Sequence, residues 1–132
     1  MPRFVSSSRA MGEIRGLYTA MVTPFRGDGS VNDETGVALA RHLLANGSHG
    51  LVVCGTTGEA TTLSDEEHVE FVRLIASELG DEAPIFAGAG SNDTAHAAHL
   101  TAMRQGPEPQ NSIAVGITQT RLQIKRPHLL EL

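Results

Sequence analysis

Apolar runs and amphipathic periods alternate three times along the first hundred residues of the chain. Short apolar runs bounded by turn residues predict buried strands, and apolar residues at every third or fourth position predict helices. The strands are expected at 16–23, 50–54 and 84–87, and the helices at 33–45, 65–79 and from 93 or 94 onward. Three consecutive strand–loop–helix units imply right-handed crossovers and a parallel sheet, so the pattern predicts an α/β fold.

Polar residues mark the expected ends of the first two helices. Asn32 is placed to cap the first helix, which Asn46 and Gly47 end. The second helix begins after Ser64, and Glu67 three positions later completes a capping box. This helix carries one apolar stripe, formed by Val69, Val72, Ile75, Ala76 and Leu79.

Three polar or glycine-rich segments follow the expected strands. They are Thr23-Pro24, the loop Gly55–Glu59 and the segment Gly88–Asn92. Because parallel strands place their carboxyl ends at one edge, we expect these segments to lie together, where α/β proteins place their sites.

The loop Gly55–Glu59 is the strongest candidate for chemistry. Gly55 and Gly58 permit backbone angles that gather amide N–H groups, and Thr56 and Thr57 add hydroxyls, which suits anion capture or proton relay. The loop lacks the lysine of a P-loop. Two alternatives stay open: a tight turn in which the threonines satisfy backbone groups, and a Glu59 carboxylate that holds the turn instead of acting as an acid or base.

The cysteine and histidines give weaker signals. Cys54 at a strand end is expected to be a small buried apolar residue and not a nucleophile. His96 and His99 have a spacing that metal ligands can use, but no further ligand completes the set, so no metal site is predicted. The other histidines are expected at the surface: His42, His49, His68 and His128.

Composition narrows the class of protein. The chain has 132 residues, which fits one small domain or part of a larger one, and a net charge of −5, which argues against nucleic acid or an anionic membrane as partner. One cysteine excludes an internal disulfide and suits the cytoplasm. Residues 1–11 are expected to be a disordered leader, with a short organellar presequence as the alternative.

The composition changes after Met103, so we expect a folded domain over 12–103 and a divergent tail over 104–132. The tail holds four basic residues against two acidic ones, whereas the preceding part holds six against thirteen. Ile113, Val115 and Ile117 alternate as in a strand, but no further strand–helix unit is expected. The tail is interpreted as an irregular C-terminus or as a linker with a tail, and the first is favoured.

Several segments resemble the dihydrodipicolinate synthase (4-hydroxy-tetrahydrodipicolinate synthase) family. Tyr18–Phe25 with Asp28–Val31 looks like the family's amino terminus, and Gly50–Leu63 is similar to its signature loop. Glu67-His68 and Ile85–Asn92 follow in the family's order. The resemblance covers roughly Gly12 to Ala102.

The resemblance implies a fold and an activity. The fold is a (β/α)₈ TIM barrel, of which this chain would hold the first three βα units, usually assembled as a homotetramer in the cytoplasm. The activity is a lyase reaction of lysine biosynthesis, in the diaminopimelate pathway. Pyruvate condenses with L-aspartate semialdehyde through a Schiff base on a barrel lysine, without metal or organic cofactor. Related pyruvate aldolases, such as N-acetylneuraminate lyase and keto-deoxy sugar-acid aldolases, share a similar loop.

The resemblance also implies roles for single residues. Thr57 would bind the pyruvate carboxylate through its hydroxyl and amide, and Thr56 would relay protons between tyrosines. A lysine feedback site would fall on Ala60, Thr61, Asp65, His68, Asn92 and His96. Asp65 and His96 depart from the histidine and glutamate of lysine-sensitive members, so feedback inhibition is not expected.

Other parts of the implied active site have no counterpart in this sequence. The only lysine, Lys125, matches no barrel strand of the family, and the only tyrosine, Tyr18, lies in the first strand. A Schiff-base enzyme needs a lysine beside the substrate carbonyl, and such a barrel needs about 250 residues. We therefore expect a truncated or frameshifted synthase product that is inactive alone.

A second class of function stays open beside the enzyme family. The chain could be a non-catalytic α/β interaction module in which the tail adds a strand to a doubly wound sheet. Parallel pairing of residues 113–117 beside the third strand would separate the two.

Overall fold

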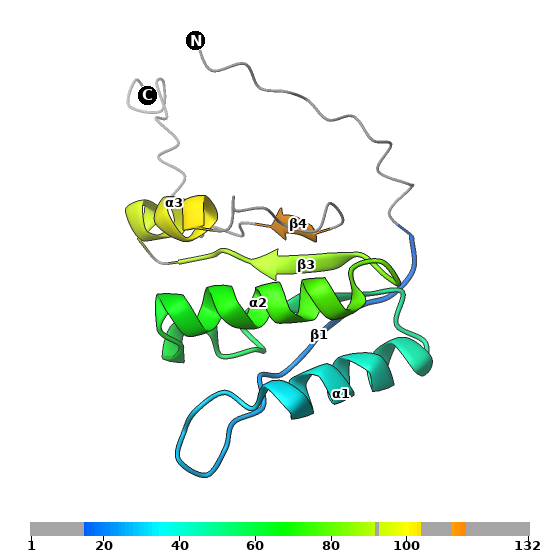
Figure 1. Cartoon of the computed structure of the whole chain (residues 1–132). Coiled ribbons are helices and arrows are strands. Elements are labelled where there is room, and N and C mark those ends of the chain that lie inside the picture. Colours follow the sequence, from blue (N-terminus) through cyan, green and yellow to red (C-terminus); the bar gives the residue numbers. More distant parts are fainter. Residues whose placement is uncertain (1–14, 92, 104–111, 116–132) are drawn as a thin grey trace, which may run out of the picture.

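The computed structural model describes residues 15–91, 93–103 and 112–115, which form a parallel sheet with helices against it (Figure 1). In chain order the elements are β1 (Tyr18–Ala20), α1 (Asp33–Ala45), β2 (Gly50–Val53), the 3₁₀ turn η1 (Ala60–Thr62), α2 (Asp65–Leu79), β3 (Ile85–Gly88), α3 (Thr94–Met103) and β4 (Ser112–Val115). The three expected strand–helix units are therefore confirmed.

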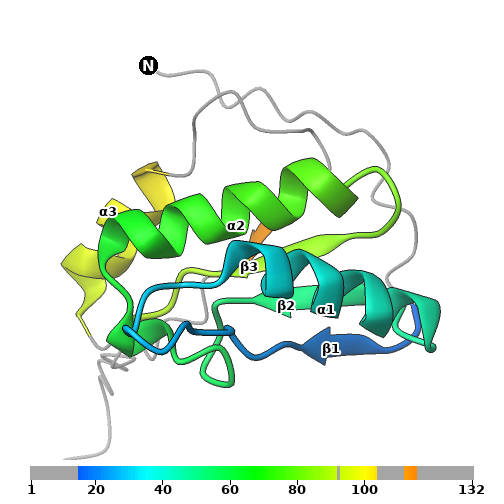
Figure 2. The same cartoon turned by 60° about the horizontal axis from the view of Figure 1, so that its bottom comes forward.

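The strands pair in their chain order, β1-β2-β3-β4, and all pairs are parallel. Leu51 of β2 is opposite Thr19 of β1 and Ile85 of β3. Helices α1 and α2 run side by side along the sheet (Figure 2). A doubly wound sheet reverses its strand order at a switch point, whereas a barrel keeps adding strands on the same side. The described part is thus a sector of a (β/α)₈ barrel.

The fourth strand agrees with the strand-like alternation noted for Ile113 and Val115. Ser112–Val115 pairs in parallel with β3, with Ile113 opposite Phe86. The expectation that no further strand–helix unit follows depends on residues 104–111 and 116–132, which lie outside the described residues. The pairing also fails to separate barrel from interaction module, since a barrel adds its fourth strand in the same place. The sequential strand order is what distinguishes them.

The core lies between the sheet and helices α1 and α2. Leu51, Val53, Ile85 and Ala87 of the strands, Ala40 of α1, and Phe71, Val72, Ile75 and Leu79 of α2 are buried. Helix α1 approaches α2 closely at Gly36, where a Cβ atom would lie 2.5 Å from Cε2 of Phe71. The apolar stripe predicted for α2 is the face that fills this core.

Both helix caps form as the sequence indicates. The Asn32 side chain accepts a hydrogen bond from the Thr35 N–H at 3.1 Å. In α2 the Glu67 N–H donates to the Ser64 hydroxyl at 3.2 Å, and the Ser64 N–H donates to the Glu67 carboxylate at 2.9 Å. These bonds satisfy helix donors that have no partner inside the helix.

Candidate functional site

The loop Gly55–Glu59 follows β2, and the other two predicted segments lie directly against it or its first peptide. The buried Thr23 hydroxyl donates to the Gly58 carbonyl oxygen at 2.7 Å. A Cβ atom on Gly88 would lie 2.2 Å from the Cys54 oxygen and 3.0 Å from Cα of Gly55. The end of β3 and the start of the loop thus touch backbone to backbone. The convergence expected from parallel strands is confirmed.

The bend that creates this loop falls on Cys54 and Glu59. Their φ angles are +53° and +55°, in the left-handed region, and Gly55 and Gly58 have no positive φ. The sequence suggested that the two glycines supply the unusual backbone angles of the loop. That expectation is wrong, because Cys54 and Glu59 supply them. Gly58 serves close packing instead, because a Cβ there would lie 3.1 Å from Cα of Cys54. The expectation that Cys54 is buried is confirmed, with 1% of its surface exposed.

Thr56 and Thr57 are exposed, and their side chains contact no polar group among the described residues. Among the residues that the structure describes, neither hydroxyl and neither N–H takes part in a hydrogen bond. The N–H groups of Gly58 and Glu59 close the turn by donating to the Gly55 and Thr56 oxygens at 3.1 and 3.0 Å. A simple turn accounts for these backbone bonds but leaves two hydroxyls and two amides available for a ligand.

Glu59 holds the turn through its backbone, and its carboxylate accepts no hydrogen bond within the described ranges. The Glu59 oxygen accepts from the Thr62 N–H at 2.9 Å and from the Thr62 hydroxyl at 2.8 Å. The idea that its side chain accepts loop N–H bonds is therefore wrong. The left-handed φ of Glu59 explains the difference, since it redirects the chain into η1.

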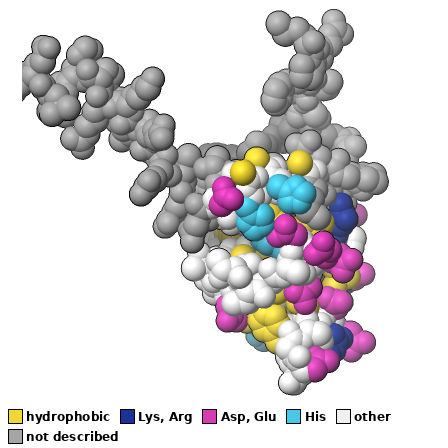
Figure 3. Space-filling model, turned by 90° about the vertical axis from the view of Figure 1, so that its left-hand side faces the viewer, with side chains coloured by type: hydrophobic (Ala, Val, Ile, Leu, Met, Phe, Trp, Pro, Cys, Tyr) yellow, Lys and Arg dark blue, Asp and Glu magenta, His cyan; other side chains and the backbone are white. Residues whose placement is uncertain are grey.

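A polar cluster lies beside the loop, between the starts of α2 and α3. The Asp65 carboxylate is 2.7 Å from Nε2 of His96 and 3.9 Å from Nε2 of His99. Nδ1 of His96 is 2.9 Å from the Ser91 hydroxyl. The hydrogen bond from His96 holds the pKa of Asp65 below its usual value of 3.8. Figure 3 shows histidine side chains among acidic ones on this end of the molecule.

The cluster contains part of the residue set expected for a lysine site. The structure brings Asp65 and His96 together, whereas Ala60 and Thr61 lie in η1 and Asn92 is outside the described residues.

No group of three or more histidine, cysteine or acidic residues in the described ranges has the geometry to hold a metal ion. No described helix is long and apolar enough to cross a membrane.

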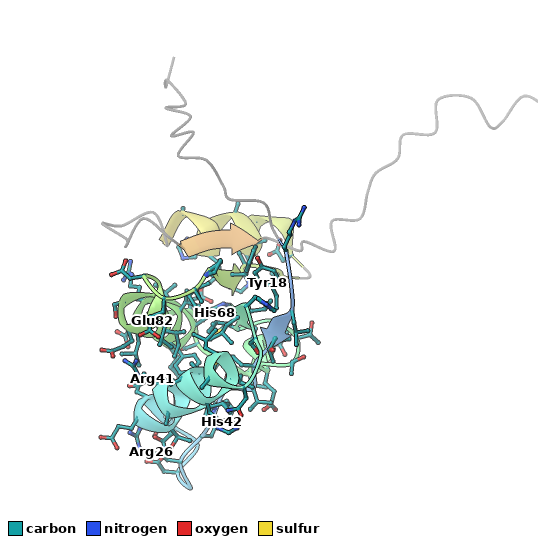
Figure 4. The ribbon with its side chains drawn as sticks, turned by 90° about the vertical axis from the view of Figure 1, so that its right-hand side faces the viewer. Tyr18, Arg26, Arg41, His42, His68 and Glu82 are labelled. Carbon is teal, nitrogen blue, oxygen red and sulfur yellow. The ribbon has the colours of Figure 1, made fainter. Side chains whose placement is uncertain are left out.

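His68 is buried, contrary to the surface position expected for it. Only 2% of its surface is exposed, and its Nε2 lies 2.8 Å from the Gly88 oxygen (Figure 4). His42 and His49 are exposed as expected, and His128 falls outside the described residues. The signal for His68 was readable, because it shares the helical spacing of Phe71, Val72 and Ile75 on the buried face of α2.

Comparisons with known proteins point to one family. The family model described as "Dihydrodipicolinate synthetase family" matches residues 13–107. A 4-hydroxy-tetrahydrodipicolinate synthase from Mycolicibacterium gilvum is 47% identical over 100 residues, which are 76% of this chain and 33% of that protein.

Solved structures agree. The 4-hydroxy-tetrahydrodipicolinate synthase of Methylacidiphilum fumariolicum SolV aligns with a TM-score of 0.68 at 40% identity, over 79% of this chain and 34% of its own. The chloride-inhibited dihydrodipicolinate synthase of Acinetobacter baumannii, complexed with pyruvate, gives 0.66 at 38% identity, over 69% and 31%.

The chain thus spans about a third of the length of the relatives that it matches. The family match covers most of the chain and includes β1, β2, β3 and the loop with Thr56 and Thr57. Strand order, loop geometry and sequence identity all lead to the same conclusion: the chain belongs to the dihydrodipicolinate synthetase family.

Proposed function

We propose that the described domain supplies the carboxylate-binding loop of a 4-hydroxy-tetrahydrodipicolinate synthase, which condenses pyruvate with L-aspartate semialdehyde. The observation that carries the proposal is the loop after β2, where Thr56 and Thr57 present hydroxyl and N–H groups that no described residue engages. Four donors at the carboxyl end of a parallel strand suit a small carboxylate. That every relative reported above is named as such a synthase favours this substrate pair over those of other pyruvate aldolases.

The two threonines take different roles in this proposal. The hydroxyl and N–H of Thr57 donate to the pyruvate carboxylate, and the Thr56 hydroxyl passes protons between tyrosines that this sequence does not contain. The Thr23–Gly58 hydrogen bond keeps the loop closed while the ligand is bound. A resident metal or organic cofactor has no role in the reaction that the family resemblance implies.

The 132-residue polypeptide is proposed to be inactive by itself. Carbon–carbon bond formation through a Schiff base needs a lysine beside the pyruvate carbonyl. The sequence holds one lysine, Lys125, which lies in the proposed divergent tail over 104–132. After incubation with pyruvate and borohydride, intact-mass measurement should show no pyruvate adduct on Lys125, and an activity assay should show no turnover. An adduct on Lys125 together with turnover would contradict the proposal.

A chimera tests the loop in a complete active site. Residues 13–107 would replace the matching segment of a full-length synthase relative, and the chimera is expected to condense both substrates. Thr57→Val in the chimera should raise the KM for pyruvate about tenfold or more, because charge-assisted hydrogen bonds are lost. Thr35→Val, an exposed helix position, serves as control. An unchanged KM in the Thr57 variant would contradict the proposal.

The cellular location, the oligomeric state and the lysine feedback site are inferred from the family alone. We infer a cytoplasmic protein that joins a homotetramer only when the rest of the barrel is present. At the residues that match the lysine site, Asp65 and His96 already bind each other. We therefore expect free lysine to leave the chimera's rate unchanged.

A further inference from the structure

The His68 ring contacts Gly88 at the end of β3, and the His68 backbone oxygen lies beside Sγ of Cys54 at the start of the loop after β2. We propose that His68 is the positioning residue that keeps the loop Gly55–Glu59 in its binding shape. The proposal rests on the proposed function of Thr56 and Thr57 as ligand-binding residues. His68 belongs to the Glu67-His68 motif and to the residues that match the lysine site. Neither of these indicates a role in holding the loop after β2. Three contacts carry the proposal.

The first contact fixes the end of β3. Nε2 of the buried His68 ring lies 2.8 Å from the Gly88 oxygen. A carbonyl oxygen can only accept a hydrogen bond, so Nε2 carries the proton and donates it. The ring thereby ties the first turn of α2 to the last residue of β3, across the interior of the fold.

The second contact passes this restraint to the loop. The Gly88 backbone lies so close to the Cys54–Gly55 peptide that a Cβ atom would come within 2.2 Å of the Cys54 oxygen. If Gly88 moves toward the Cys54–Gly55 peptide, it pushes that peptide. If Gly88 moves away, the peptide loses the contact that holds it in place. Gly88 transmits the position of the His68 ring because it has no side chain to keep the two backbones apart.

The third contact is between His68 and the bend itself. Sγ of Cys54 lies 4.0 Å from the His68 backbone oxygen. Cys54 has a φ of +53°, a conformation that non-glycine residues keep only when their surroundings enforce it. The His68 backbone oxygen supplies part of that enforcement at the sulfur, and the His68 ring supplies the other part through Gly88. The bend in turn sets the direction in which Thr56 and Thr57 leave the sheet.

Nuclear magnetic resonance on the full 132-residue chain tests the proposal. In the wild type, ring ¹⁵N shifts of His68 should report a proton on Nε2. In His68→Leu, which fills the space but cannot donate, the Gly58 and Glu59 amides should exchange with solvent about tenfold faster, the effect of roughly one lost buried hydrogen bond. His68→Gln can still donate and should restore slow exchange. Amides of α1 serve as reference for global opening.

Two outcomes would overturn the proposal: a proton on Nδ1 alone, or unchanged loop exchange in a folded His68→Leu variant. If His68→Leu does not fold, the wild-type ring signal and the comparison with His68→Gln decide. His42→Gln, an exposed substitution, should change neither the loop nor its exchange.

A pyruvate titration separates this proposal from the function on which it rests. If the function holds, pyruvate shifts the Thr56 and Thr57 amide signals of the wild type and of His68→Gln, and the response weakens about tenfold in His68→Leu. A wild type with no pyruvate response contradicts pyruvate binding by this chain alone; the chimera then decides on the proposed function, and loop exchange decides on His68. A full pyruvate response in His68→Leu contradicts the positioning role.

Discussion

The loop after β2 and the polar cluster between α2 and α3 are neighbours, yet different forces hold them in place. The loop is fixed by buried backbone contacts around Cys54, by the His68 ring and by the Thr23 hydroxyl. The cluster is fixed by side chains in contact with water, since the Asp65 and His96 side chains are 32% and 41% exposed. A substitution changes side chains and leaves backbone atoms in place, so backbone contacts leave little room for an added side chain. An exposed ion pair needs only one acidic and one basic side chain within reach, and it contributes little stability.

The sequence reflects this difference. The loop keeps the motif on which the family resemblance rests, whereas Asp65 and His96 stand where lysine-sensitive members have a histidine and a glutamate. An acid and a base have thus changed places, and the structure shows that they still meet, at 2.7 Å. The Asp65–His96 pair forms in this arrangement. From the family resemblance we expect that a lysine site built on those two side chains is lost. We therefore expect substitutions in the loop to cost stability and substitutions in the cluster to cost little.

The largest expected effect comes from Gly88→Ala. The added methyl group would meet the Cys54 oxygen at 2.2 Å, where backbone and not a flexible side chain must move. We expect the free energy of unfolding to fall by about 3 kcal/mol, the upper range for overpacking. Urea denaturation followed by circular dichroism measures it. Gly27→Ala is the matched control, because nothing lies within 4 Å of its Cβ position. A stable Gly88→Ala variant would mean that the loop tolerates movement of β3.

Thr23→Val is expected to have the second largest effect. The change keeps the shape of the side chain but removes the donor that the Gly58 oxygen accepts at 2.7 Å in a buried place. Leaving that carbonyl without its partner should cost about 2 kcal/mol of unfolding free energy. The same denaturation experiment measures the loss, with Thr35→Val at an exposed helix position as control. Equal stability of the two variants would remove Thr23 from the set of loop anchors.

The sequence predicted most of the fold because its signals are local. The capping residues Asn32, Ser64 and Glu67 placed α1 and α2 within the bounds that the structure shows. Strand ends were less predictable, since they depend on neighbours. β2 ends at Val53 because Cys54 turns away from the sheet. β3 extends to Gly88 because its backbone packs against that turn.

The candidate site was predicted in outline and missed in its supports. The glycine–threonine loop was readable from composition alone, but the residues that shape it are far apart in the chain. Thr23 and Gly58 are 35 positions apart, and His68 and Gly88 are 20 apart. No sequence spacing announces such contacts. They follow from the way parallel strands bring their ends together, which becomes concrete only once the register is known.

The third prediction concerns the pH dependence of the cluster. The pKa of Asp65 is lowered by the hydrogen bond from His96. Its stabilising effect is therefore present above the usual value of 3.8 and is lost as the pH falls through the folded-state value. Asp65→Asn should be less stable than the wild type at pH 5, by less than Thr23→Val. The difference should narrow below pH 4. Thermal unfolding between pH 5 and 3 measures it, and a constant difference would contradict the assignment.

The smallest effects separate the two histidines that face Asp65. His96 lies 2.7 Å from one carboxylate oxygen and also contacts Ser91, whereas His99 lies 3.9 Å from the other oxygen and its side chain is 61% exposed. His96→Gln should lower the unfolding midpoint slightly at low salt, and about 1 M NaCl should remove most of the difference, because exposed pairs are screened. His99→Gln should leave the midpoint unchanged at either salt concentration. If His99→Gln had the larger effect, the cluster would be organised around that residue, and α3 would be held to α2 by a contact other than the one described.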